Sequence, residues 1–118
     1  MNVKNNKRRR ESQSKIERAF IELLQTREIK DITVSELIKM AGVNRSTFYA
    51  NYIDIFDLAD KLRETLANDF SNLFADYDYF EERTGALRMF RHIKENQIFY
   101  TTYFKLCYDD QHLISIYD

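Results

Sequence analysis

The sequence has no proline, no tryptophan and only two glycines among its 118 residues. Proline and glycine are the residues that most often interrupt helices, so their scarcity leaves long stretches in which a helix can continue. Within these stretches apolar residues recur three or four positions apart, which is the spacing of one face of a helix. We therefore predict an all-α fold.

Residues that bind metals or form disulfides are also scarce. The lone Cys107 cannot form an intramolecular disulfide, and with only His92 and His112 beside it there is no metal-ligand cluster at a recognisable spacing. We interpret Cys107 as a small apolar residue and His92 as a surface residue. No nucleophile–base set, paired-carboxylate pattern or phosphate loop stands out. We expect a protein that is not an enzyme and that uses no cofactor and no metal.

Long apolar runs are absent as well. No window reaches the uninterrupted apolar length of a membrane span, and no apolar segment follows the basic residues near the N-terminus as it would in a secretory signal. These features predict a soluble cytoplasmic protein that does not bind a membrane.

Charge is unevenly distributed, although the net charge is only −1. Residues 1–50 contain eleven Lys or Arg against six Asp or Glu, whereas the other 68 residues contain seven against thirteen. A basic part joined to an acidic part is the electrostatic pattern expected of a chain with one DNA-facing end.

The stretch from Thr33 to Tyr52 predicts two short helices joined by a tight turn. Thr33 and Glu36 form the pattern of a capping box, so the first helix should begin at Val34. Gly42 should end it, because glycine adopts positive φ without a Cβ penalty. The apolar residues on one face of this helix are Val34, Leu37, Ile38 and Ala41.

The second helix of this pair should begin near Asn44 or Arg45, with Asn44 as its N-cap. Phe48 and Tyr52 are four residues apart and should face the core. The side chains left on the outer face are hydrogen-bond donors suited to phosphates and base edges: Arg45, Ser46, Thr47, Tyr49 and Asn51. The two helices together predict a helix-turn-helix.

The run from Thr33 through Ala41–Tyr49, followed by Tyr52 and Asp57–Leu58, resembles the DNA-binding domain of TetR-type bacterial transcriptional regulators. The resemblance covers about residues 7–62. It implies a sequence-specific regulator at the bacterial nucleoid, a repressor that binds a palindromic operator as a homodimer and is released by a small-molecule effector. Many members have a lysine that binds a DNA phosphate where this chain has Ile55, so we assign no phosphate contact there.

The resemblance also implies roles for the outward residues. Base edges would be reached by Arg45, Ser46, Thr47 and Asn51, and the DNA backbone would be held by Tyr49. Thr33, at the start of the motif, is a further candidate for DNA binding.

Residues 1–10 contain almost nothing apolar and are expected to form a flexible basic arm. The arm would lie along phosphates or in the minor groove; the alternative is a merely solvated basic terminus. Its candidate DNA-binding residues are Lys7, Arg8, Arg9 and Arg10.

The remaining elements complete a three-part organisation: the arm, a helix-turn-helix domain over residues 11–53, and a connecting helix with a regulatory and dimerisation region over residues 54–118. An amphipathic helix is predicted from Ser14 to about Gln25, with Ile29 and Ile32 buried in the connection that follows. Asp54 should cap the long connecting helix. The resemblance implies a three-helix bundle with a helix-turn-helix, followed by a long connecting helix and a partial or short C-terminal helical domain. TetR-type regulators usually carry a longer helical C-terminal domain, so we expect a fragment or a truncated member that self-associates.

Twelve of the seventeen aromatic residues lie between Phe70 and Tyr117. They would line a pocket for a small apolar or aromatic effector, or form an ordinary helical core or an interface. The candidate pocket residues are Phe70, Phe74, Phe90, Tyr100, Tyr103 and Phe104. A second hypothesis for the whole chain is a protein-interaction or antirepressor module that retains the helix-turn-helix fold but acts through this aromatic region.

Overall fold

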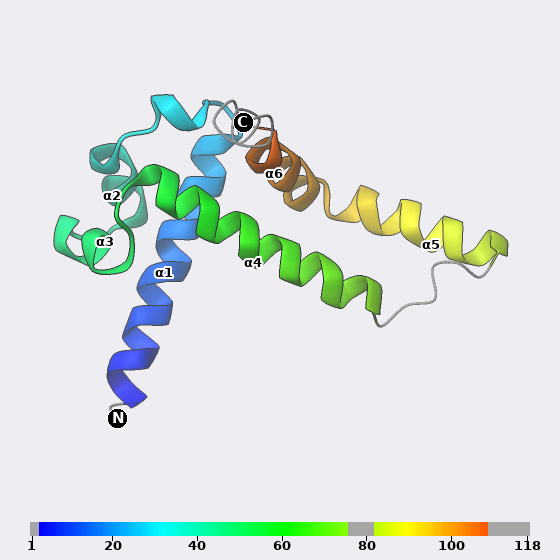
Figure 1. The fold of residues 1–118 in the computed structure, drawn as a ribbon, viewed down its shortest axis with the longest axis horizontal. Helices are drawn as coiled ribbons and strands as arrows, with labels where there is room; N and C mark the ends of the chain where they lie inside the picture. Colours follow the sequence, from blue (N-terminus) through cyan, green and yellow to red (C-terminus); the bar gives the residue numbers. More distant parts are fainter. Residues whose placement is uncertain (1–2, 76–81, 109–118) are drawn as a thin grey trace, which may run out of the picture. The chain divides into compact units, whose positions relative to one another are not determined.

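The computed structural model describes residues 3–75 and 82–108, and the side chains of residues 6–72 and 87–108. Every regular element within these residues is helical, which confirms the all-α fold (Figure 1). The elements are α1 (Val3–Leu24), the 3₁₀ helix η1 (Ile29–Asp31), α2 (Val34–Ala41), α3 (Arg45–Asn51), α4 (Ile55–Ala75), α5 (Glu82–Glu95) and α6 (Gln97–Cys107). Across the described residues, no helix combines the length and the apolar character needed to cross a lipid bilayer.

The chain divides into two compact units, residues 1–60 and 61–118. The division falls within α4, whose first turn belongs with the helix-turn-helix. The boundary expected from the sequence, after residue 53, lies just before this helix. Each unit is described by itself below.

The core of the first unit forms where α1 packs against α2 and α3. On α1, Ile16 and Phe20 are fully buried, and Leu37 of α2 and Phe48 of α3 are also fully buried. Burying each such side chain contributes about 1.5–3 kcal/mol before conformational entropy is subtracted. The predicted apolar stripe of α1 is therefore confirmed, and it holds the two short helices in place.

The connection between α1 and α2 is short and partly apolar. Ile29 within η1 and Ile32 just after it are 4% and 5% exposed, as predicted from the sequence. The backbone N–H of Ile32 donates to the carbonyl oxygen of Ile29 at 3.1 Å and closes the 3₁₀ turn. This connection is anchored in the core.

The N-terminal residues differ from the prediction. Residues 3–10 are not an arm of irregular structure but the first turns of α1, which is continuous from Val3 to Leu24. Lysine and arginine are good helix formers, no glycine or proline interrupts the segment, and a helix already nucleated by a buried stripe extends at little cost. The side chains of Lys7, Arg8, Arg9 and Arg10 are exposed.

The predicted cap of α4 is confirmed. The Asp54 carboxylate accepts a hydrogen bond from the backbone N–H of Asp57 at 2.8 Å, and the Asp57 carboxylate accepts one from the N–H of Ile53 at 2.9 Å. Negative charge in the first turn is also favoured by the helix dipole. The two contacts set the direction in which the chain leaves α3.

The second unit contains the rest of α4 with α5 and α6. The apolar spacing in the sequence predicts one helix from Thr84 or Gly85 to Asn96 and another from Ile98 to Cys107. Both helices form close to these ranges, although α5 begins at Glu82. The acidic and aromatic run from Ala75 to Gly85 predicts a loop or a helix break, most of which lies outside the described residues. The sequence also predicts a break at Asp109–Asp110 and a short apolar tail from His112 to Tyr117, and both lie outside the described residues.

Aromatic contacts link α4 to α6 within this unit. The Phe70 ring lies edge-on to Tyr100, with 5.9 Å between centroids, and parallel to Tyr103 at 6.2 Å. Tyr100 and Leu106 are buried. In contrast, several apolar side chains of α5 and α6 are exposed, namely Leu87, Phe90, Ile98 and Phe104.

Candidate nucleic-acid interface

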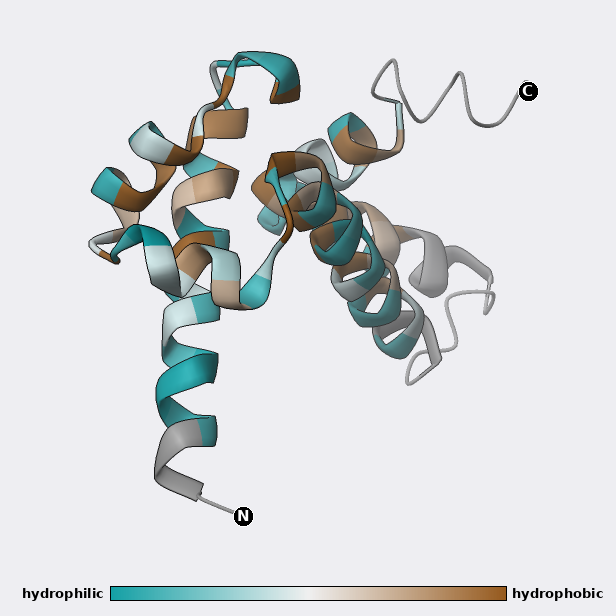
Figure 2. Ribbon diagram, turned by 60° about the vertical axis from the view of Figure 1, so that its left-hand side comes forward, coloured by the Kyte–Doolittle hydropathy of each residue, from teal (hydrophilic) through white to brown (hydrophobic). Residues whose placement is uncertain are grey.

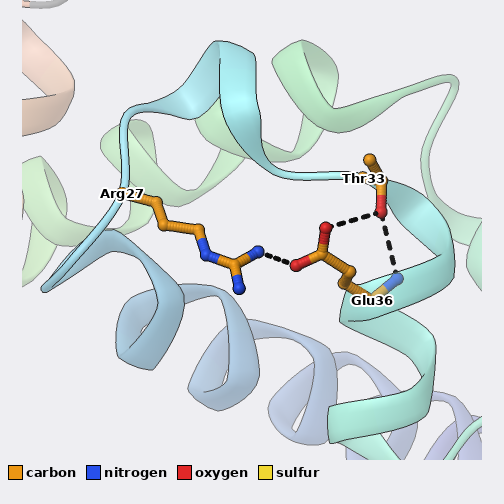
Figure 3. Close-up of polar contacts among 3 residues, drawn as sticks. All are labelled: Arg27, Thr33 and Glu36. Atoms are coloured by element: carbon orange, nitrogen blue, oxygen red, sulfur yellow. Dashed lines mark hydrogen bonds and ion pairs between the residues drawn. The ribbon is translucent and has the colours of Figure 1, made fainter.

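Thr33 is the N-cap of α2, as predicted. Its hydroxyl accepts a hydrogen bond from the backbone N–H of Glu36 at 3.2 Å and donates to the Glu36 carboxylate at 3.3 Å (Figure 3). The same carboxylate forms an ion pair with Arg27, from the segment after α1. The Thr33 hydroxyl, a candidate for DNA contact, is thus already engaged in capping and in tying α2 to the preceding connection.

Gly42 makes the turn between the two helices. Its φ of 72° lies in the left-handed region, where a side chain with a Cβ is strained. Its N–H and that of Val43 both donate to the carbonyl oxygen of Ile38, at 2.9 and 3.1 Å. The helix therefore ends where the sequence predicted, and the chain reverses within two residues.

Asn44 caps α3 through one oxygen atom. Its Oδ1 accepts from the backbone N–H of Thr47 at 2.9 Å, from the Thr47 hydroxyl at 2.7 Å and from the Ser46 hydroxyl at 2.8 Å. This stabilises the first turn of α3. It also orients two predicted base-contacting hydroxyls toward the cap, so each would have to rotate to meet a base.

The outer face of α3 is exposed at three of its five predicted positions, and Thr47 is half-buried. Phe48 and Tyr52 are buried at 0% and 5% exposure, whereas Arg45, Ser46 and Tyr49 are exposed. The Tyr49 ring lies edge-on to Phe48, with 5.2 Å between centroids. A guanidinium and a phenol, suited to base edges and phosphates, thus project from a helix whose other face is rigidly held.

Arg45 is held by the neighbouring helix. Its Nη2 donates to the hydroxyl of Ser35 in the first turn of α2, at 2.6 Å. Ser35 was not predicted from the sequence as a functional residue, since its ten-residue separation from Arg45 matches no regular spacing within one helix. The contact links the exposed surfaces of the two helices of the motif.

Asn51, at the end of α3, is the predicted base-contacting residue whose surroundings differ most from the expectation. It is half-buried, and its Oδ1 accepts from Arg9 Nε at 3.0 Å and from Gln13 Nε2 at 3.2 Å, both on α1. Its Nδ2 donates to the carbonyl oxygen of Thr47 at 2.9 Å. Arg9, a basic residue of the N-terminal turns, is therefore hydrogen-bonded to α3. Gln13 also holds Asn51, although the sequence did not predict Gln13 as a functional residue.

A sequence signal for these two residues exists in retrospect. Arg9, Gln13, Ile16 and Phe20 follow one another at spacings of four, three and four, so the polar pair continues the buried face of α1. The N-terminal turns of α1 extend beyond α2 and α3 in both views, as a hydrophilic stretch in Figure 2. Basic side chains are thus displayed beside the end of α3.

Two residues behind this surface are buried. Ile55 is 7% exposed, so the position at which many TetR-type regulators have a lysine contributes to packing here. Burial, together with the negative charges of Glu17 and Asp57, raises the pKa of Tyr52 to about 12. The Tyr52 phenol therefore stays neutral to a higher pH than an ordinary tyrosine.

The candidate effector residues are only partly brought together. Phe70, Tyr100 and Tyr103 are in contact, whereas Phe90 and Phe104 are 69% and 53% exposed. The side chain of Phe74 lies outside the described residues. A hydrogen bond with Cys107, more than burial, raises the pKa of Tyr103.

His92, expected at the surface, is half-buried. Its Nδ1 lies 3.2 Å from the Asn96 side-chain nitrogen, and its ring is edge-on to Tyr100 with 5.6 Å between centroids. Within residues 3–75 and 82–108, no three His, Cys, Asp or Glu side chains gather as a metal site would require.

The geometry of α2, the Gly42 turn and α3 is that of a helix-turn-helix motif. A comparison with curated proteins finds a relative with the same motif in its name, the HTH-type dhaKLM operon transcriptional activator DhaS of Lactococcus lactis subsp. lactis (strain IL1403), 33% identical over 106 residues. The match covers 89% of this chain and 55% of the relative, so the chain spans about half the length of the protein it resembles. No family model matches the chain, and no solved structure matches it.

Proposed function

We propose that this chain is a DNA-binding transcriptional regulator, with α3 as the helix that reads DNA, and not an enzyme. The observation that carries the proposal is the outer face of α3, where Arg45 and Tyr49 project from a helix capped by Asn44 and anchored by Phe48. Regulation of transcription, the role in the relative's name, is consistent with this surface.

The chain is proposed to be of TetR type. Support comes from the sequence pattern across the motif and from its confirmed helix boundaries, with Gly42 as the turn and Asn44 as the cap. The burial of Ile55 is a departure from that pattern, so binding would depend more heavily on phosphate contacts made elsewhere.

In the proposed complex, Arg45, Ser46 and Thr47 contact base edges, while Tyr49 contacts the DNA backbone. Arg45 is the strongest of the base-contacting candidates, because a guanidinium can pair bidentately with a guanine. The exposed basic residues of α1 would bind phosphates from a helix rather than from an arm. These are Lys7, Arg8 and Arg10.

We further propose that two copies bind a near-palindromic operator in the cytoplasm, with half-sites about 34–36 Å apart or a multiple of that. The exposed Leu87, Phe90 and Ile98 of α5 and α6 support association, because apolar side chains gain free energy when an interface covers them. Concentration-dependent mass in sedimentation experiments would support the dimer, and a monomer at all concentrations would overturn it.

The proposed outcome of binding is repression, with release by a small apolar or aromatic effector. Contact between Phe70, Tyr100 and Tyr103 supports an aromatic site in the second unit. A reporter with the selected operator placed over a promoter tests the sign of regulation, since the relative is named an activator. Ligand-dependent loss of DNA binding tests the effector.

The decisive experiment is selection of bound duplexes from a random DNA library, followed by anisotropy titrations of the selected sequence. The doubly substituted Arg45→Ala, Tyr49→Ala protein should lose at least tenfold in affinity while remaining folded by circular dichroism. Arg88→Ala with Tyr108→Ala, two exposed residues of the second unit, is the matched control. Unchanged affinity in the first variant would overturn the proposal.

The alternative is a protein-interaction or antirepressor module, which the exposed apolar residues of α5 and α6 also favour. It requires a complex with another regulator that forms equally well with and without DNA. A wild-type chain that selects no DNA sequence but forms such a complex would support this alternative.

A further inference from the structure

Asn51 is the outward residue of α3 whose side chain hydrogen-bonds to α1 in the described structure. Arg45, Ser46 and Tyr49 are exposed, whereas Asn51 is half-buried against the face of α1 that carries Arg9 and Gln13. The question is whether its amide remains able to read a base.

An asparagine that reads adenine does so with both ends of its amide, accepting with Oδ1 and donating with Nδ2. A side-chain carbonyl oxygen has two lone pairs. In this protein both are occupied, by Arg9 Nε at 3.0 Å and Gln13 Nε2 at 3.2 Å. Pairing with a base through Oδ1 would break at least one of these hydrogen bonds.

The contacts of Asn51 join elements far apart in the sequence. Arg9 and Gln13 precede it by 42 and 38 residues, and its Nδ2 also donates to the carbonyl oxygen of Thr47 within α3. One amide therefore connects the last turn of α3 to two successive turns of α1. Such a connection restrains the angle and the axial position of the short helix.

The other end of α3 is restrained independently. Asn44 caps it, and Arg45 is tied to Ser35 of α2. The middle is anchored by the fully buried Phe48. Since α3 has only seven residues, release of its C-terminal end would let the helix fray or tilt about this anchor.

We infer that Asn51 is a positioning residue and not a base reader: with Gln13 and Arg9 it holds α3 against α1, so that the DNA preference of α3 depends on side chains of α1. This inference rests on the proposed DNA-binding function. Gln13 is thus expected to affect the DNA sequence preference of α3, although its side-chain amide donates to Asn51 and not to a base.

The same contact sets the position of the basic turns of α1. Arg9 uses its Nε for Asn51, while the exposed Lys7, Arg8 and Arg10 lie on the turns around it. The end of α3 and the cationic end of α1 are thereby held at one relative position. A phosphate contact by these cations would then fix the register of α3 on the bases.

The test compares Asn51→Ala, Gln13→Ala and the double variant. Ser46→Ala, at a proposed base-contacting residue hydrogen-bonded to Asn44, is the reference for the loss of one base contact and should reduce discrimination locally. Each protein is titrated with the selected operator and with a set carrying every single base-pair change. Asn51→Ala and Gln13→Ala should each reduce discrimination about threefold to tenfold at several base pairs. They should leave the salt dependence of binding unchanged, because neither removes a cation.

A base-reading role predicts a different pattern. Asn51→Ala would then lose discrimination at one base pair, and Gln13→Ala would have no effect; that result would overturn the inference. The conservative variant Gln13→Glu provides a second comparison. It substitutes a carboxylate for the donor that faces the Asn51 oxygen and should reproduce the effect of Gln13→Ala.

Thermal unfolding distinguishes failure of the inference from failure of the proposed function. The melting temperature should fall by about 4 °C in Gln13→Ala and by more in Asn51→Ala, which also removes the hydrogen bonds with Arg9 and Thr47. The double variant should melt close to Asn51→Ala, since the hydrogen bond of Gln13 is already lost there. Additive shifts would overturn the inference. If the wild-type chain selects no DNA sequence, the proposed function fails. The melting temperatures of the single and double variants still decide whether Asn51 holds α3 to α1.

Discussion

The guanidinium of Arg45 donates to the hydroxyl of Ser35 at 2.6 Å, so the first helix of the motif orients the first side chain of the second. Both residues are exposed. A long side chain that is already oriented loses less rotamer entropy when it binds a base or a phosphate.

We predict that Ser35→Ala weakens binding to the selected operator about threefold to tenfold without affecting stability by more than about 0.5 kcal/mol, the range of ordinary surface substitutions. The effect should vanish in an Arg45→Ala background, because Ser35 acts through Arg45. Equal losses in both backgrounds would mean that Ser35 contacts DNA itself. Anisotropy titrations of the four proteins measure this.

Gly42 should tolerate no ordinary side chain without cost. A Cβ at this position would meet nothing within 4 Å, so the cost comes from the φ of 72° and not from a clash. We predict that Gly42→Ala destabilises the chain by about 1–2 kcal/mol in urea unfolding. Gly42→Asn should cost less, because asparagine adopts the left-handed conformation more readily. Equal stability of Gly42→Ala and the wild type would contradict this explanation.

The raised pKa of Tyr52 predicts that the folded chain loses stability in alkaline solution. Because its pKa is raised from 10.0 to about 12 in the folded chain, the unfolded chain loses the phenolic proton first. The stability contributed by the neutral phenol is fully present below pH 10 and is lost as the pH rises toward 12. The difference amounts to roughly 2–3 kcal/mol for a shift of this size.

Tyr52→Phe removes the titrating group and should flatten the decline of unfolding free energy between pH 10 and pH 12. Tyr49→Phe, which removes an exposed phenolic hydroxyl from α3, is the matched control. The comparison concerns slopes with pH, so a constant difference in stability between the proteins does not affect it. Parallel curves for wild type and Tyr52→Phe would contradict the prediction.

The helical basic end of α1 predicts a salt effect on DNA binding. Replacing Lys7, Arg8 and Arg10 together by alanine should lower the slope of log affinity against log salt by about 0.9 for each residue that contacts a phosphate. Substituting Arg88, Arg91 and Lys94 removes the same charges from exposed positions of the second unit and serves as the matched control. If both triple variants change the slope equally, the effect reflects net charge and not a contact by α1.

Much of the motif could be predicted because its signals are local. Thr33 and Asn44 each accept a hydrogen bond from a backbone N–H three residues on, and Gly42 supplies the left-handed residue that ends α2. Such signals act within one helical turn, so they can be read from the order of residues. The burial of Phe48 and Tyr52 followed from the same periodicity.

The expectations for residues 1–10 and for the aromatic cluster were less accurate. Composition alone favoured an arm, but α1 continues through Lys7–Arg10 because the buried stripe further along nucleates it. The number of aromatic residues does not indicate which of them are in contact and which are exposed. Phe70 packs on Tyr100, whereas Phe90 on α5 is exposed to solvent.

The sequence by itself determined that the chain is helical, where α2 and α3 begin and end, and which face of α3 is buried, because caps, glycine and periodicity act over a few residues. Only the tertiary structure decided how those faces are used. It directs Arg45 to Ser35 and Asn51 to Arg9 and Gln13, since contacts across 10, 42 and 38 residues depend on how the helices pack. How the helices pack therefore determines which side chains are available to contact DNA.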